Sequence, residues 1–112
     1  MNEDTVIEIE AVRAGAEAAC ALLKVLSNPD RLLLLCALAA GERNVGELEA
    51  SLGIVQPTLS QQLAVLREAQ LVSTRRDGKN VYYQMESAQA QAVMQVLYAQ
   101  FCQPAKGKRS RK

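Results

Sequence analysis

The stretch QPTLSQQLAVLREAQLV, residues 56–72, has the pattern of a helix with two very different faces. Leu59, Leu63 and Leu66 recur at spacings of four and three, which predicts one buried face. An ordinary surface helix carries Glu and Lys on its other face, because they solvate well and pair along the helix. Here the outer face and its flank instead carry small or neutral residues and one Arg: Pro57, Thr58, Gln61, Ala64 and Val65, then Ser60 and Arg67.

A second, shorter helix is predicted immediately before this one. Asn44 and Glu47 have the spacing of a capping box, in which each side chain bonds the other residue's backbone N–H. This helix should run from Val45 to Leu52 and stop at Gly53. Two short helices joined by a tight turn that contains Gly are typical of a helix-turn-helix.

The residues after Leu71 change from a helical to a strand pattern. Segments 72–76 and 80–85 are rich in β-branched and aromatic residues, and Asp77-Gly78 between them is a strong hairpin signal. A two-stranded ribbon directly after a helix-turn-helix is a wing. Ser87 is then placed to cap a last helix over residues 88–102, which Pro104 ends.

Two further helices are predicted before the helix-turn-helix. The first covers residues 5–26, and the second covers residues 29–40, with Asn28 as its N-cap and Gly41 as its stop. We expect the second helix to bury Leu32, Leu35, Cys36 and Ala39. The predicted fold class is therefore mainly α with a small β-hairpin: a winged helix-turn-helix of four helices, two strands and a last helix.

Both terminal helices carry a long apolar stripe. Its positions are Ile9, Val12, Ala16, Ala19, Leu23 and Leu26 in the first helix, and Ala90, Met94, Leu97 and Phe101 in the last. Packing the two helices against each other, and against the same pair of a second chain, would bury both stripes. The sequence therefore predicts a homodimer formed through the first and last helices.

The length of 112 residues suits one small domain, which we place at residues 1–104. Residues 105–112 form a basic, flexible tail with five positive charges, whereas the rest of the chain has a net charge of −4. The tail serves either as a solubilising segment or as an arm for nucleic acid. The longest apolar run, Leu32–Ala40, is too short to span a membrane, and the N-terminus is unlike a signal peptide, so we expect a cytoplasmic protein with no membrane partner.

The residues that enzymes and metal centres use are scarce. Histidine is absent, which removes His-based acid–base chemistry and the commonest transition-metal ligand. The three cysteines, Cys20, Cys36 and Cys102, have no CxxC spacing, and no glycine-rich phosphate loop is present. We therefore expect neither an enzyme nor a protein that carries a cofactor.

The outer face of the 56–72 helix meets the requirements of the DNA major groove. A helix in that groove must be slim, present hydrogen-bonding groups to base edges and keep carboxylates away from phosphates. Gln61 can bridge N6 and N7 of adenine, and Val65 can touch a thymine methyl. Nearby basic residues are placed to meet phosphates: Arg67 on the helix, and Arg75, Arg76 and Lys79 around the wing tip. The alternative is a helical hairpin with a merely solvated surface.

Three stretches, LSNPDRLLLL, VGELEASLGIVQPTLSQQLAVLREAQLV and RRDGKNVYYQM, resemble the ArsR/SmtB family of winged-helix repressors over about residues 20–102. The resemblance implies a homodimer that binds an inverted-repeat operator in double-stranded DNA and releases it when an inducer acts. It places Gln56, Thr58, Ser60 and Gln61 on the DNA-reading stretch. Many members of the family have Ser where this chain has Val55, so Gln56 is expected to replace it as the cap of the helix.

The metal sites of the family have no counterpart in this sequence. The segment NVGELEASLG contains no thiol, and residues 88–103 contain neither His nor an acidic residue. Cys36 and Cys102 instead resemble the thiol pair of the BigR-type, persulfide-sensing branch, which implies a redox switch whose modification releases DNA. We expect Cys20 to be a buried packing residue, as most free cysteines are.

Two alternatives remain at the level of the sequence. In the first, Cys20, Cys36 and Cys102 together bind a soft metal or metalloid such as arsenite, and DNA binding is kept. In the second, the winged helix is a protein-interaction module that does not bind DNA. The sequence identifies neither the inducer nor the operator.

Overall fold

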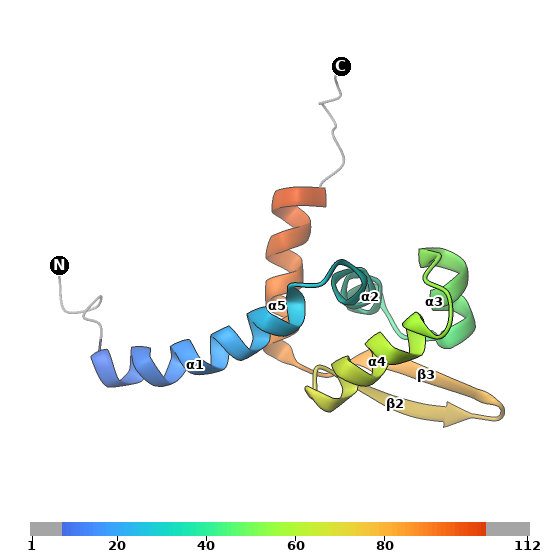
Figure 1. The fold of residues 1–112 in the computed structure, drawn as a ribbon, viewed down its shortest axis with the longest axis horizontal. Coiled ribbons are helices and arrows are strands. Elements are labelled where there is room, and N and C mark those ends of the chain that lie inside the picture. Colours follow the sequence, from blue (N-terminus) through green and yellow to red (C-terminus); the bar gives the residue numbers. More distant parts are fainter. Residues whose placement is uncertain (1–7, 103–112) are drawn as a thin grey trace, which may run out of the picture.

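The computed structural model describes residues 8–102, which form six helical segments and one small sheet (Figure 1). The predicted first-helix residues 5–7, Pro104 and the basic tail 105–112 lie outside the described residues. In chain order the elements are α1 (Ile9–Leu26), α2 (Pro29–Ala40), β1 (Arg43–Asn44), α3 (Val45–Leu52), α4 (Thr58–Glu68), β2 (Val72–Asp77), β3 (Asn80–Met85), α5 (Ala88–Leu97) and a π-helical turn (Tyr98–Cys102).

Local capping signals fix the helix starts as the sequence predicted. Asn28 Oδ1 accepts a hydrogen bond from the backbone N–H of Arg31 at 3.0 Å, at the start of α2. At α3 the capping box is complete, because Asn44 Oδ1 accepts from the Glu47 N–H and Glu47 Oε1 accepts from the Asn44 N–H, both at 2.8 Å. Gly53 ends α3 in the left-handed conformation, with φ of 72°, which favours glycine.

Replacing the α3 cap should measurably weaken the fold. Asn44→Ala removes the Oδ1 acceptor of the Glu47 N–H and leaves only the reciprocal bond from the backbone N–H of residue 44 to the Glu47 carboxylate, so we expect a loss of about 1 kcal/mol in the free energy of unfolding. Urea denaturation followed by circular dichroism measures this loss. Ser51→Ala is the control, because Ser51 is an exposed residue within the same helix. A midpoint equal to that of the wild type would contradict the assigned cap.

The sheet has three antiparallel strands in the order β1-β3-β2, and β2 and β3 form the wing (Figure 1). Their register pairs Val72 with Met85 at the base and Asp77 with Asn80 at the turn. The sequence prediction missed β1, which adds two residue pairs to the edge of β3. A two-residue strand has no periodicity of its own, so it exists only because the end of α2 brings it beside β3.

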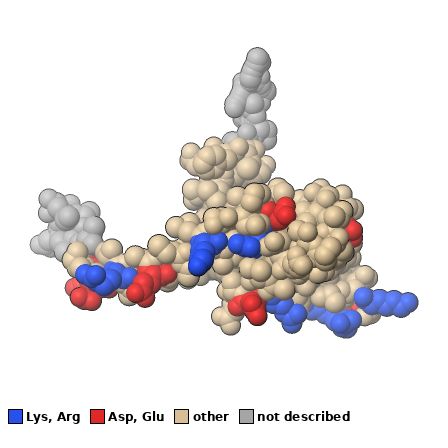
Figure 2. All heavy atoms as spheres, viewed as in Figure 1, with Lys and Arg blue, Asp and Glu red and all other residues tan. Residues whose placement is uncertain are grey.

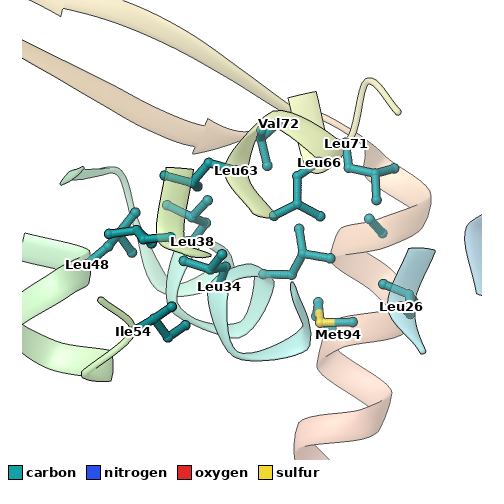
Figure 3. Close-up of a cluster of buried hydrophobic side chains, with 13 residues drawn as sticks. Leu26, Leu34, Leu38, Leu48, Ile54, Leu63, Leu66, Leu71, Val72 and Met94 are labelled. Carbon is teal, nitrogen blue, oxygen red and sulfur yellow. The ribbon is translucent and has the colours of Figure 1, made fainter. Parts of the chain in front are cut away.

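Thirteen buried apolar residues form one core around α2 (Figure 3). The prediction for α2 was partly wrong: its buried residues are Leu34, Leu35 and Leu38, whereas Leu32, Cys36 and Ala39 are half-buried. Helix α2 contacts α1, α3, α4, α5 and β3, so it is covered on several sides. Leu32–Leu35 are four consecutive leucines, so the sequence does not show which side of this central helix is most deeply buried.

The terminal helices do not pack against each other along their stripes. Helix α5 packs on α2 and buries Ala90 and Met94, while α1 joins the body at its C-terminal end, where Leu26 is buried. The two helices then point in different directions (Figure 1). As a result Ile9, Leu23 and Phe101 are 62%, 55% and 80% exposed. The first stripe is therefore largely uncovered in the single chain, whereas the last stripe is covered at Ala90 and Met94 and open at Phe101.

The last predicted helix changes its winding before it ends. Regular α-helix stops at Leu97, and Tyr98–Cys102 continues as a single π-helical turn. Such turns are rare and often lie at functional sites. None of the helices within residues 8–102 is both long and apolar enough to cross a membrane.

Candidate functional site

Helix α4 has the two faces that its sequence predicted. Leu59, Leu63 and Leu66 are at most 1% exposed and anchor the helix in the core. The opposite side is open to solvent at Ser60, Gln61, Ala64, Val65 and Arg67, and Thr58 is half-buried at its start. The helix therefore presents a slim, mostly neutral face, with the charged residues Arg67 and Glu68 at its C-terminal end.

Gln56 caps the start of α4, a role that Val55 cannot fill because its side chain has no hydrogen-bond acceptor. Its Oε1 accepts hydrogen bonds from the backbone N–H of Ser60 at 3.1 Å and from the Ser60 hydroxyl at 2.7 Å. Gln56 and Ser60 are thus bonded to each other at the start of the helix. Gln61 is the exposed amide on the outer face beside them, which makes it the strongest candidate for a base contact.

Arg31 contacts α4 on the side away from its outer face, and the sequence prediction missed this role. Its Nε donates to the Val25 carbonyl at 2.7 Å, and its Nη1 donates to Gln62 Oε1 at 2.9 Å. One half-buried guanidinium therefore connects the end of α1, the start of α2 and the inner side of α4. A cation in the first turn of a helix opposes the helix dipole, and this was the available signal that Arg31 needs partners elsewhere.

Lys and Arg side chains gather along the wing, below α4 in the view of Figure 2. Arg76 and Lys79 are exposed on either side of the hairpin turn, and Arg67 is exposed at the end of α4. A shallow hollow between α4 and the wing is lined by Ser60, Ala64, Val65, Arg67 and Glu68 of α4 and by Tyr83 of β3. The outer face of α4 and the wing thus form one continuous surface.

Arg75 differs from the other wing cations because its guanidinium is bonded within the chain. Its Nε and Nη2 donate to Glu42 Oε2 and Oε1 at 2.8 and 2.9 Å, and its Cζ lies 4.7 Å from the centroid of the Tyr82 ring. These hydrogen bonds lower the pKa of Glu42 and raise that of Arg75. Because the pKa of Glu42 is lowered, the pair persists at neutral pH and is lost only as the pH falls through that lowered value.

Cys36 lies between α2 and α5, in the wall of a hollow of about 350 Å³ that Ala39, Gln91, Met94 and Tyr98 also line. Its Sγ is 3.9 Å from Met94 Sδ. Burial raises the pKa of the Cys36 thiol, and the nearby Cys102 thiol raises it further. This effect of Cys102 on the pKa of Cys36 indicates that the π-helical turn Tyr98–Cys102 brings the two thiols into electrostatic reach of each other.

The other two cysteines are exposed. Cys102 ends the π-helical turn, one turn beyond Tyr98, and is a free thiol. The prediction that Cys20 is buried was wrong for the single chain. Helix α1 joins the body only at its C-terminal end, and Cys20 lies before that part of the helix. Within residues 8–102 no three His, Cys, Asp or Glu side chains are grouped so as to hold a metal ion.

A model of the arsR family of bacterial regulatory proteins matches residues 28–74, from the cap of α2 to the first residues of β2. The biofilm growth-associated repressor of Agrobacterium fabrum is 51% identical over 98 residues, which cover 88% of this chain and 84% of that protein. The chain belongs to the arsR family.

Solved arsR-family structures confirm the winged helix-turn-helix fold. The transcriptional repressor BigR from Xylella fastidiosa superposes with a TM-score of 0.81 at 47% identity, covering 88% of this chain and 100% of that one. Reduced HlyU from Vibrio cholerae gives a TM-score of 0.80 at 37% identity, covering 84% of this chain and 99% of that one. The family and its members make this chain a transcriptional regulator and not an enzyme.

Proposed function

We propose that this arsR-family chain is a repressor that binds an inverted-repeat operator as a homodimer. The observation that carries this proposal is the outer face of α4, where Gln61 is exposed among small, neutral residues beside a basic wing. Groove-binding helices have this character, because base edges need hydrogen-bonding groups and phosphates need cations. Two such helices related by a two-fold axis would bind half-sites about one helical turn apart, roughly 34–36 Å.

The exposed apolar residues of α1 and of the π-helical turn after α5 support a second copy of the chain as the partner. Large apolar residues such as Leu23 and Phe101 are more than half exposed, and they lie on helices that project from the body. A two-fold axis would let each stripe meet the same surface of the other copy. This arrangement buries apolar area without requiring any further protein.

The reduced protein should sediment as a dimer at micromolar concentration. Leu23→Ala removes apolar area from both copies of the interface, so we expect the dimer dissociation constant to rise about tenfold. Leu33→Ala is the matched control, since Leu33 is 45% exposed on α2, outside both stripes. Sedimentation equilibrium measures both constants, and a stable wild-type monomer would refute the proposed dimer.

We further propose that modification of Cys36 and Cys102 by persulfides or organic polysulfides releases the operator. Exposed Cys102 meets the reagent first, and its thiolate attacks the central sulfur of a trisulfide R–S–S–S–R′, which expels R–S⁻. The Cys36 thiolate then attacks the same central sulfur, which expels R′–S⁻. Two cysteine sulfurs are oxidised, two reagent sulfurs are reduced, and Cys36–S–S–S–Cys102 remains.

The extra sulfur has a geometric reason. A direct disulfide requires the two Cα atoms to lie within about 7 Å, and an inserted sulfur relaxes this demand. The bridge would join the end of the π-helical turn Tyr98–Cys102 to α2. Helix α2 packs on α4 and also holds it through Arg31 and Gln62, so a shift in α2 would alter the spacing of the two α4 helices in the dimer.

One set of operator-binding measurements separates this proposal from its alternatives. The protein is tested on DNA from its own upstream region when reduced, after an organic trisulfide and after arsenite. We expect the reduced protein to bind this DNA tightly and the trisulfide to release it. Arsenite should leave the affinity unchanged. Release by arsenite that requires Cys20 would favour the soft-metalloid sensor, and no binding by the reduced protein would favour the protein-interaction module.

A further inference from the structure

The ion pair between Arg75 and Glu42 crosses the whole width of the sheet. Arg75 lies on the outer strand β2 and is paired with Tyr82 of the middle strand β3, which is paired in turn with Asn44 of β1. Glu42 comes two residues before Asn44, directly after α2. The Arg75 side chain therefore lies over the Tyr82 ring and donates two hydrogen bonds to the Glu42 carboxylate on the far side of β3.

The base of the wing contacts α2, α3, α4 and α5 as well as β1, and the Arg75–Glu42 pair adds a side-chain connection to the end of α2. Strand β1 contributes two residue pairs, and the β2–β3 ribbon projects beyond the helices (Figure 1). A forked guanidinium–carboxylate pair fixes orientation as well as distance, because both nitrogen–oxygen contacts must be satisfied together. Stacking over an aromatic ring adds to this constraint. Glu42, Arg75 and Tyr82 thus add an orientational restraint to a ribbon whose base already packs on the helices.

Arg75 also faces away from the candidate DNA-reading helix. Side chains alternate along a strand, so Arg75 and Tyr82 lie on the sheet face opposite to Val72 and Tyr83. Val72 is buried in the core, and Tyr83 lines the hollow beside α4. Arg76, the next residue in β2, is on the α4 side and exposed. Adjacent arginines of one strand therefore have different surroundings.

We propose that Arg75 and Glu42 are positioning residues that hold the wing at a fixed angle to the end of α2, and that Arg75 does not bind a DNA phosphate. This inference rests on the proposed DNA-binding function and replaces the role that the sequence suggested for Arg75. Phosphate contacts of the wing then belong to Arg76 and Lys79. Glu42, an acidic residue beside a basic surface, has a role that does not oppose DNA binding.

Operator affinity as a function of salt tests the proposal. Glu42→Gln and Arg75→Ala should each weaken binding by the same factor, up to about fivefold, because an exposed ion pair shifts the population of the positioned wing by no more than that. The slope of log affinity against log salt should stay at the wild-type value for both. Arg76→Ala is the matched control, and its slope should fall by about one phosphate contact.

Exchanging the charges provides a stricter test. The double variant Glu42→Arg, Arg75→Glu can reform the pair in reverse, so it should bind the operator more tightly than the summed effects of the two single substitutions predict. If Arg75 binds phosphate, the effects of Glu42→Arg and Arg75→Glu simply add, Arg75→Ala lowers the salt slope by about one, and Glu42→Gln tightens binding. Any of these three results would overturn the proposal.

A measurement without DNA keeps this inference separate from the proposed function. Hydrogen exchange at the backbone amides of β1 and β3 should be faster in Glu42→Gln than in the wild type, while exchange in the core of α4 should be unchanged. Equal exchange in the wing would refute the positioning role even if the protein binds DNA. Faster exchange in a protein that binds no operator would refute the proposed function alone.

Discussion

An organic trisulfide should lower the operator affinity of the wild-type protein by about 5- to 150-fold, the usual range of coupling between two sites. Cys36→Ser and Cys102→Ser should each abolish this response and leave reduced-state binding near the wild-type value, because each removes one end of the bridge and neither lies on α4 or the wing. Fluorescence anisotropy with labelled operator measures both effects.

Cys20→Ser is the control for this experiment, since Cys20 is an exposed thiol on α1 and should leave the response intact. Mass spectrometry of the treated wild type should find Cys36 linked to Cys102 within one chain, with the gain of one sulfur and the loss of two hydrogens. A link from Cys20 to either partner, or retained operator affinity after treatment, would refute the proposed switch.

Gln61→Ala should weaken specific operator binding by about 1–3 kcal/mol and hardly change binding to unrelated DNA. A bidentate amide contact to adenine has this magnitude, and Gln61 is the exposed amide on the outer face of α4, whereas Gln56 and Ser60 bond each other. Competition binding with operator and unrelated duplexes measures the two affinities at one salt concentration, as electrostatic binding requires.

Gln84→Ala is a matched control for this substitution. Gln84 is an exposed glutamine on the outer sheet face, where it donates to Ser73 Oγ at 3.3 Å, so it should leave specificity unchanged. Base-pair substitutions in each half-site would then locate the position at which Gln61→Ala no longer discriminates. Full specificity in Gln61→Ala would show that α4 does not read bases through this residue.

The elements with strong local signals were predictable from the sequence. The boundaries of α2 and α3 follow from Asn28, Asn44 and Gly53, whose capping and turn preferences act within a few residues. The hairpin follows from Asp77-Gly78 between two alternating segments. The three leucines of α4 set its orientation, since a helix with one apolar face can be buried in only one way. These determinants are local, so one sequence is enough to show them.

The candidate site was partly predictable for the same reason. The exposure of Gln61 and Arg67 follows from the phase of α4, and the exposure of Lys79 follows from its place at the hairpin turn. The pairing of Gln56 with Ser60 joins residues four apart, which lie on one side of a helical turn.

The tertiary structure alone decided how distant segments meet. Arg75 and Glu42 are 33 positions apart, and only the register of β1 on β3 makes them partners. Which side of α2 is most deeply buried depends on five neighbouring elements, because its run of leucines has no phase of its own. Cys20 is exposed because only the C-terminal end of α1 packs against the body of the domain. Contacts of this kind depend on how whole elements pack, and nothing in the local sequence of either partner specifies them.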